Sequence, residues 1–151
     1  MKTLLLIDAY AMIYRAYYAF IRAPRMNSRG ENTSAIFGFI VTFEDLLKRL
    51  KPSHIAVAFD PAGPTFRHEA FEQYKAQRQE TPEDIRWAVP RIKQILHAMN
   101  VPVLEVAGYE ADDVIGTIAH RDLVAQVILV ETSQRVTAAA DLDDDVAALS
   151  V

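Results

Sequence analysis

The sequence contains no cysteine, which excludes disulfide bonds and thiolate metal sites within the chain. Long apolar runs are also missing near its start. Residues 4–7 are apolar but are followed by Asp8, so this run is too short for a signal-peptide core or a membrane span. Aromatic residues are absent after position 113. We therefore expect a protein of the cytoplasm with no membrane partner, whose last part builds little core.

Charge is distributed unevenly along the 151 residues, whose net charge is −4. Residues 122–151 contain six acidic residues and one basic residue, a balance of −5, whereas residues 1–121 have a balance of +1. We expect residues 131–151 to be weakly folded or to form a short peripheral helix. A divalent cation bound to the main body would make it positive, so the acidic total does not exclude a nucleic-acid partner.

Short apolar runs alternate with segments of helical periodicity. Asp8 and Asp60 follow the first two runs directly. Gly38 interrupts an otherwise good helix and indicates a close helix contact. The alternation predicts an α/β fold with a mostly parallel central sheet and helices on both faces. We expect strands at 3–7, 54–59, 101–106 and 126–130. We expect helices at 10–21, 34–50, 82–99 and 109–120. Thr33 or Ser34 would cap the second helix, and Thr81 would cap the third, with Pro82 at its first helical position.

Five carboxylates stand where strands end or a helix begins, namely Asp8, Asp60, Glu110, Asp112 and Asp113. The carboxyl ends of parallel strands meet at one edge of a sheet, where ligands bind. Oxygen ligands suit hard cations such as Mg²⁺ and Mn²⁺, which phosphodiester cleavage requires. Each acid alone is also explained as a helix cap or turn residue. Their combination favours a metal site, because close carboxylates repel one another without a cation.

Basic residues form two groups on either side of Asp60 in the sequence. Arg15, Arg22, Arg25 and Arg29 follow the first strand, and Arg67, His68, Lys75 and Arg78 follow Asp60, with Tyr74 beside Lys75. Arg and Lys bind phosphates, and an aromatic ring stacks on an unpaired base. The alternative is a solvated charged face with no ligand.

Four sequence blocks, in order, resemble one family. They are LLLIDAYAMIYRAYYAF, NTSAIFGF, HIAVAFDPAGPTFRHEAFEQYKAQRQETPEDI and VPVLEVAGYEADDVIGT. Together they resemble the 5′-nuclease domain at the N-terminus of bacterial DNA polymerase I, a member of the flap-endonuclease-like, PIN-like family. The resemblance covers residues 1–121, so we expect this domain there and a divergent acidic tail at 122–151.

The resemblance implies a 5′-3′ exonuclease and structure-specific 5′-flap endonuclease that uses Mg²⁺ or Mn²⁺ in replication and repair. Its substrates would be DNA with 5′ ends or flaps and RNA primer–DNA hybrids, near the bacterial nucleoid. Residue by residue, the five carboxylates match its metal ligands. Lys75 and Arg78 match its catalytic basic pair, and Arg15, Arg67 and Tyr74 are further candidates for nucleic-acid contact. Residues 76–99 would form the arch that receives a free 5′ end.

The sequence departs from the family pattern after the last predicted strand. The family continues with a Thr-x-Asp-x-Asp loop, but here residues 131–135 read Glu-Thr-Ser-Gln-Arg. Asp143, Asp144 and Asp145 lie in a different context and are interpreted as a solvated face. The second metal site and the C-terminal end of the fold are therefore expected to be incomplete, as in a truncated, fused or frame-shifted chain. Two alternatives remain: a non-catalytic nucleic-acid-binding remnant and a small PIN-type ribonuclease.

Overall fold

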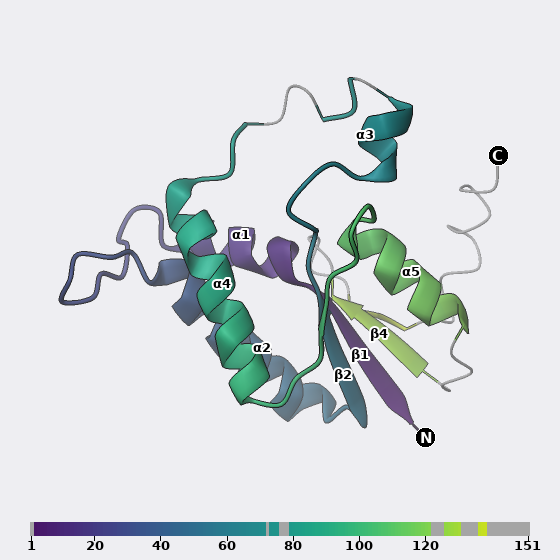
Figure 1. Cartoon of the computed structure of the whole chain (residues 1–151). Coiled ribbons are helices and arrows are strands. Elements are labelled where there is room, and N and C mark those ends of the chain that lie inside the picture. Colours follow the sequence, from purple (N-terminus) through teal and green to yellow (C-terminus); the bar gives the residue numbers. More distant parts are fainter. Residues whose placement is uncertain (1, 72, 76–78, 122–125, 131–135, 139–151) are drawn as a thin grey trace.

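The computed structural model describes residues 2–71, 73–75, 79–121, 126–130 and 136–138. Within these ranges, strands and helices alternate as the sequence predicts (Figure 1). The elements in chain order are β1 (Thr3–Asp8), α1 (Ala9–Ala19), α2 (Ser34–Leu50), β2 (His54–Ala58), α3 (Phe66–Ala70), α4 (Glu83–Ala98), β3 (Val103–Leu104), α5 (Ala111–Arg121), β4 (Gln126–Val130) and β5 (Val136–Ala138).

The sheet has the strand order β3-β2-β1-β4-β5. β1 lies at its centre and pairs in parallel with β2 and with β4, and β3 pairs in parallel with β2. β5 pairs antiparallel with β4 at the edge. The carboxyl ends of β1 and β2 consequently lie side by side, with Asp8 opposite Ala58.

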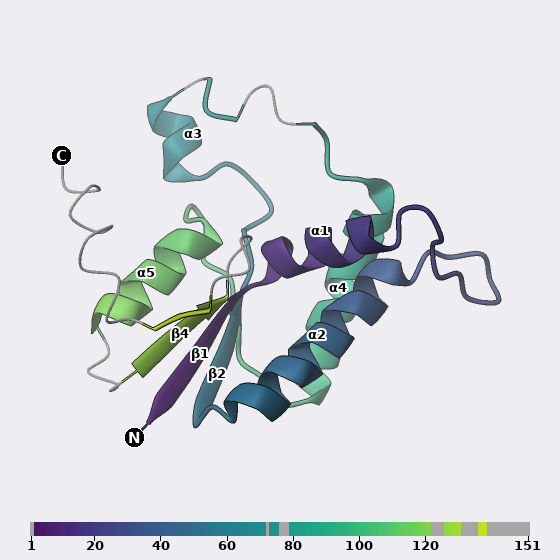
Figure 2. The same ribbon diagram turned by 180° about the vertical axis from the view of Figure 1, so that it is seen from behind.

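The two faces of the sheet are covered by different helices. Leu5 and Ile7 of β1 belong to a core shared with α1, α2 and α4, whereas Leu4 and Leu6 belong to a smaller core with α5. Figures 1 and 2 show α1, α2 and α4 on one side of the sheet and α5 on the other. Each fully buried aliphatic side chain contributes about 1.5–3 kcal/mol. Because successive side chains of β1 point to opposite faces, the strand packs against helices on both faces of the sheet, as the sequence predicts.

Most predicted elements are confirmed, with changes at their ends. The helix expected from Thr81 begins at Glu83, because Pro82 has extended backbone (ψ 142) and is the N-cap rather than the first helical residue. The strand expected at 101–106 is reduced to Val103–Leu104, an edge strand that pairs only with β2. α3 and β5 were not predicted; α3 is a single short turn of helix with no buried residue.

The expected arch at 76–99 is wrong for its larger part. Ile85, Ile92 and Leu96 of α4 are fully buried, so this helix is part of the core that covers the sheet. The chain that rises above the end of the sheet is instead the connection between β2 and α4, which includes α3 (Figure 1). Residues 76–78 lie outside the described ranges.

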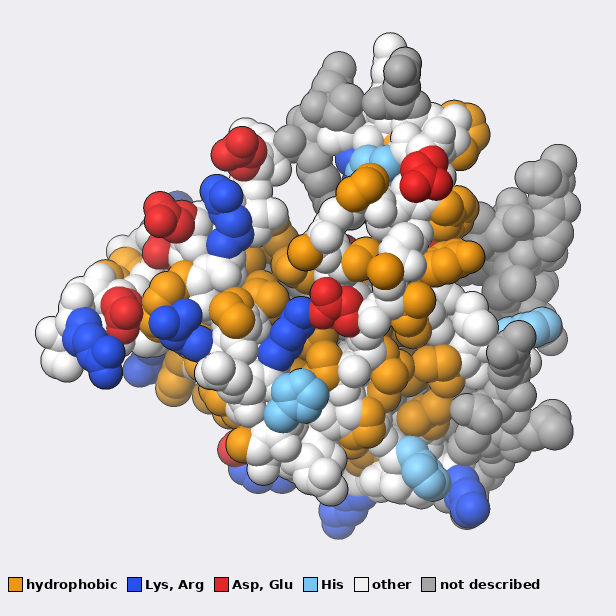
Figure 3. Space-filling model, viewed as in Figure 1, with side chains coloured by type: hydrophobic (Ala, Val, Ile, Leu, Met, Phe, Trp, Pro, Cys, Tyr) orange, Lys and Arg blue, Asp and Glu red, His pale blue; other side chains and the backbone are white. Residues whose placement is uncertain are grey.

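The surface differs from one region to the next. On the face in Figure 3, Lys and Arg side chains lie toward α4 and the connection between α1 and α2, and apolar side chains gather nearer the middle. Large exposed apolar side chains include Phe66, Phe71 and Tyr109. None of the helices in the described ranges is long and apolar enough to cross a membrane.

Gly38 lies where α1 and α2 pack closely against each other. A Cβ atom at this position would lie 2.6 Å from the Cβ atom of Ala16. We predict that Gly38→Ala lowers the free energy of unfolding by about 1–3 kcal/mol, because overpacking outweighs the higher helix propensity of alanine. Gly116 of α5 has open space around it, so Gly116→Ala should stabilise by about 0.5–1 kcal/mol. Urea unfolding of both variants checks this; stabilisation by both would contradict the close contact.

Candidate active site

The predicted carboxylates come from three places that the fold brings to one edge of the sheet. Asp8 is the last residue of β1 and caps α1, since its Oδ1 accepts a hydrogen bond from the Ala11 N–H at 3.2 Å. Asp60 follows β2, and its Oδ1 accepts from the Ala111 N–H at 2.7 Å. It therefore links the end of β2 to the start of α5.

Glu110 immediately precedes α5, which begins at Ala111 and not at 109 as predicted. The Asp113 side chain explains this start, because its Oδ2 accepts a hydrogen bond from the Glu110 N–H at 3.0 Å. Asp113 is thus a helix cap, as the alternative interpretation held, and Asp112 lies beside it in the first turn.

A groove of about 570 Å³ runs along this edge. Asp8, Asp60, Glu110 and Asp112 line it together with Lys75. A smaller neighbouring hollow of about 260 Å³ shares Asp60, Lys75 and Glu110. Four of the five predicted metal ligands therefore face one groove, and Asp113 is not among its lining residues.

Negative charges oppose one another in this groove. Burial raises the pKa of Asp8 to about 6, the hydrogen bond from Ala11 works against this shift, and the charges of Asp112 and Asp60 add to it. Burial also raises the pKa of Asp112, reinforced by Asp60, Glu110 and Asp113 and reduced by Lys75. The fold thus keeps carboxylates close together in partly buried positions, where ionisation is disfavoured.

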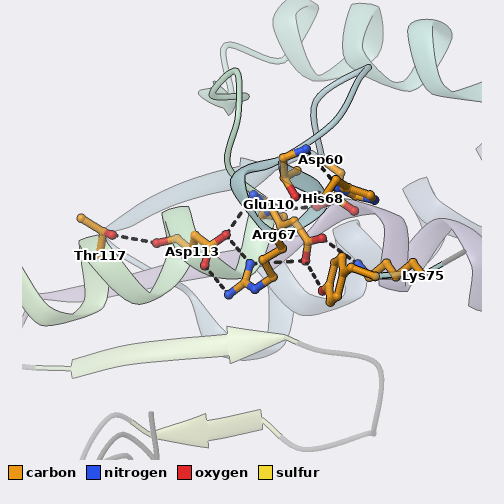
Figure 4. Close-up of polar contacts among 10 residues, drawn as sticks. Asp60, Arg67, His68, Lys75, Glu110, Asp113 and Thr117 are labelled. Carbon is orange, nitrogen blue, oxygen red and sulfur yellow. Dashed lines mark hydrogen bonds and ion pairs between the residues drawn. The ribbon is translucent and has the colours of Figure 1, made fainter. Parts of the chain in front are cut away.

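Basic side chains neutralise Glu110 and Asp113 (Figure 4). The Arg67 guanidinium donates to both carboxylate oxygens of Asp113, at 2.7 Å each, and lies 3.6 Å from Glu110 Oε2. Lys75 Nζ donates to Glu110 Oε1 at 2.8 Å, and the Tyr74 hydroxyl donates to Oε2 at 3.3 Å. The Asp113 carboxylate accordingly raises the pKa of Arg67.

The donor set fits a hard cation, because every candidate ligand is a carboxylate oxygen. The present arrangement does not yet form a complete cage. Across the described ranges, no three acidic or histidine side chains lie close enough to hold one ion. Two of the five acids point instead to Arg67 and Lys75. Binding an ion would therefore require a local rearrangement of side chains.

The predicted nucleic-acid residues lie in different surroundings. Arg15 is exposed on α1. Arg67, Tyr74 and Lys75 contact the acids, and the Tyr74 ring packs edge-on against His68 with centroids 5.2 Å apart. Arg78 lies outside the described residues. Nucleic-acid binding by these residues remains a prediction.

Several residues around the groove were missed. Tyr10, Tyr14 and Tyr18 of α1 line it, and the Tyr14 hydroxyl donates to Thr81 Oγ1 at 3.2 Å. Their spacing of four residues is a signal that could have found this stripe. His68, counted only as a basic residue, lines the smaller hollow and accepts from the Thr65 N–H at 3.1 Å in a capping arrangement.

Comparison with known proteins identifies relatives over most of the chain. The DNA polymerase I of Treponema pallidum is 45% identical over 120 residues, and that of Bacillus caldotenax is 42% identical over 121. These matches cover 80% of this chain but only 12% and 14% of the relatives, so the chain spans about an eighth of their length.

Solved structures have the same fold at low sequence identity. The zinc-bound 5′-exonuclease of bacteriophage T5 has a TM-score of 0.64 and 21% identity, covering 87% of this chain and 49% of that one. The flap endonuclease-1 of Methanococcus jannaschii has a TM-score of 0.55 and 17% identity, covering 97% and 59%. The predicted PIN-like α/β fold is therefore confirmed.

A family described as the 5′-3′ exonuclease, N-terminal resolvase-like domain, matches residues 3–140. This match confirms the resemblance inferred from the four sequence blocks and extends past residue 121, where those blocks end. The chain belongs to the family of 5′-3′ exonuclease N-terminal domains.

Proposed function

We propose that the chain is a metal-dependent 5′-3′ exonuclease domain that also cleaves 5′ flaps in DNA. The observation that supports this most is the shared groove, in which Asp8, Asp60, Glu110 and Asp112 come together from three separate elements. Family membership supports the same reaction class. A bacteriophage T5 flap endonuclease of similar fold has been solved with DNA and metal ions.

Asp8, Asp60 and Asp112 would hold Mg²⁺ or Mn²⁺ in this groove, whereas Glu110 and Asp113, which the sequence also predicts as ligands, are paired with Lys75 and Arg67. When bound, such an ion would neutralise the substrate phosphate and supply Lewis-acid polarisation. The fixed positions of Asp8 and Asp60 come from their backbone hydrogen bonds. Because the two aspartates of the family's Thr-x-Asp-x-Asp loop are missing at residues 131–135, we propose that the second metal site is incomplete.

Lys75 would bind the scissile phosphate, assisted by Arg78. In the structure Lys75 lines the groove and its Nζ donates to Glu110 Oε1 at 2.8 Å, so a phosphate oxygen in the groove would compete with this carboxylate for the ammonium group. Tyr74 would stack on the terminal base, and Arg15 would contact the backbone on the α1 side. Arg67 is also predicted to contact the nucleic acid, although its guanidinium faces Asp113.

The proposed substrates are DNA with free 5′ ends or flaps, including RNA primer–DNA hybrids, in the bacterial cytoplasm at the nucleoid. The division into a nuclease domain at 1–121 and a divergent tail at 122–151 also remains a proposal. A second candidate function is a DNA-binding domain without catalysis. It is favoured by the ion pairs that occupy Glu110 and Asp113.

Cleavage of a labelled 5′-flap duplex tests the proposed function. We expect cleavage with Mg²⁺ or Mn²⁺, none with EDTA, and a loss of at least about 100-fold in Asp60→Asn, as expected for losing a metal ligand. Asparagine retains the acceptor for Ala111, so the fold is preserved. Asp45→Asn, which changes an exposed acid on α2, should cleave normally. Equal cleavage by Asp60→Asn and the unmodified chain would refute the metal site.

Metal-free folding stability should depend on Asp8. The pKa of Asp8 is about 6 in the folded chain against an ordinary value of 3.8. The protonated carboxyl therefore contributes its full share to the free energy of unfolding below pH 3.8, and this share is lost as the pH rises through 6. At pH 8, Asp8→Asn should therefore be more stable by roughly 1–3 kcal/mol. The difference should vanish near pH 4. Urea unfolding in EDTA measures this difference, and an equal difference at both pH values would contradict a raised pKa for Asp8.

Flap binding at two salt concentrations, measured together with cleavage, tests both candidate functions. If the chain only binds DNA, Asp60→Asn should bind normally and neither protein should cleave. Under either function, Lys75→Ala should bind more weakly with a salt slope lower by about one, because one phosphate contact is lost. Lys48→Ala removes an exposed lysine on α2 and should leave the slope unchanged. An unchanged slope in Lys75→Ala would exclude the phosphate contact.

A further inference from the structure

Arg67 makes the most complete ion pair in the described part of the chain. Its Nη1 and Nη2 atoms donate to Oδ2 and Oδ1 of Asp113, both at 2.7 Å, which is the two-pronged geometry that suits a guanidinium and a carboxylate. Nη1 also lies 3.6 Å from Glu110 Oε2. One cation thus contacts two of the three acids at the start of α5, Glu110 and Asp113.

The pair is partly shielded from water. The side chains of Arg67, Asp113 and Glu110 are 29%, 20% and 9% exposed. The guanidinium carbon lies 4.8 Å from the centre of the Phe66 ring, and Phe66 packs against Tyr109. Such a pair is held more firmly than a surface ion pair, whose typical value is only about 0–1 kcal/mol.

Backbone contacts fix the segment that carries Arg67. The Phe66 N–H donates to the Gly108 carbonyl at 2.8 Å, and Thr65 caps α3 together with His68. The Phe66–Gly108 hydrogen bond therefore joins the start of α3 to the loop before α5, next to the ion pair. Figure 4 shows Arg67 between Asp113 and Glu110, with Lys75 on the other side of Glu110.

The acids of the site consequently fall into two groups. Asp8, Asp60 and Asp112 line the groove and make no ion pair with another described residue. Asp113 is absent from the groove lining and has both carboxylate oxygens on Arg67. A divalent cation could reach Asp113 only by displacing a bidentate guanidinium.

We propose that Arg67 is a positioning residue that occupies the place of a second cation at Asp113 and Glu110. A divalent ion then binds at Asp8, Asp60 and Asp112, and Asp113 stays outside the ligand set. Arg67 also ties the segment that leads to Lys75 to the acidic helix. This inference rests on the proposed metal dependence and names which acids take part.

Mn²⁺ binding to the full, DNA-free chain tests the proposal, with affinity and stoichiometry measured by calorimetry. Asp113→Asn should bind Mn²⁺ within about twofold of the unmodified chain, whereas Asp60→Asn should lose at least about tenfold. Arg67→Gln should bind about five- to tenfold more tightly or take up an additional ion, because Asp113 is released. Structural damage would act in the opposite direction and weaken binding.

Matched variants complete the experiment. Arg67→Lys keeps the charge and should restore the original stoichiometry, and Arg67→Gln combined with Asp113→Asn should return the affinity to that of the unmodified chain. Arg49→Gln removes an exposed arginine that pairs with Asp45 on α2 and should change nothing. If Arg67→Gln does not fold, Asp113→Asn decides the question alone.

The outcomes separate this inference from the proposed function. Mn²⁺ binding that is unchanged in Arg67→Gln, or that falls about tenfold or more in Asp113→Asn, overturns the role of Arg67 and leaves metal dependence intact. Failure of the unmodified chain to bind Mn²⁺ overturns the proposed metal dependence and this inference with it.

Discussion

Repulsion between carboxylates at one edge of a parallel sheet is the constraint on which the rest of the site depends. β1 and β2 run in parallel, so Asp8 and Asp60 leave the sheet at the same end. Asp60 then accepts a hydrogen bond from Ala111 and brings the acidic start of α5 to this edge. The backbone thus concentrates negative charge in a partly buried groove, at a cost that a cation would remove.

The connection between β2 and α4 supplies part of the compensation. Arg67 and Lys75 reach back from this connection to Asp113 and Glu110, and Phe66 packs on Tyr109 beside them. In the described part of this connection Thr65 is buried, but α3 has no buried residue. The ion pairs of the connection therefore hold it against α5, and the same contacts place Lys75 in the lining of the groove, where we propose that it binds a phosphate.

Local sequence patterns predicted the strands and helices that supply many of the buried residues of the main core. β1, β2, α2 and α4 follow from apolar periodicity, and Asp8 and Asp60 follow from their places after strands. Patterns failed where a tertiary contact decides the outcome. The Arg67–Asp113 pair joins residues 46 positions apart, and the Asp113 carboxylate accepts hydrogen bonds from this guanidinium and from the Glu110 N–H. Similarly, β3 is short because it has a partner on one side only, and nothing within residues 101–106 shows this.

We propose that the acids lining this groove bind a divalent cation. Anomalous diffraction from crystals of the chain grown with Mn²⁺ tests it most directly, because the scattering locates the ion without reference to activity. We expect an anomalous Mn²⁺ peak among the carboxylates of Asp8, Asp60 and Asp112, with Arg67 still bound to Asp113. Absence of any Mn²⁺ peak in the groove, with the crystals saturated in the ion, would contradict it.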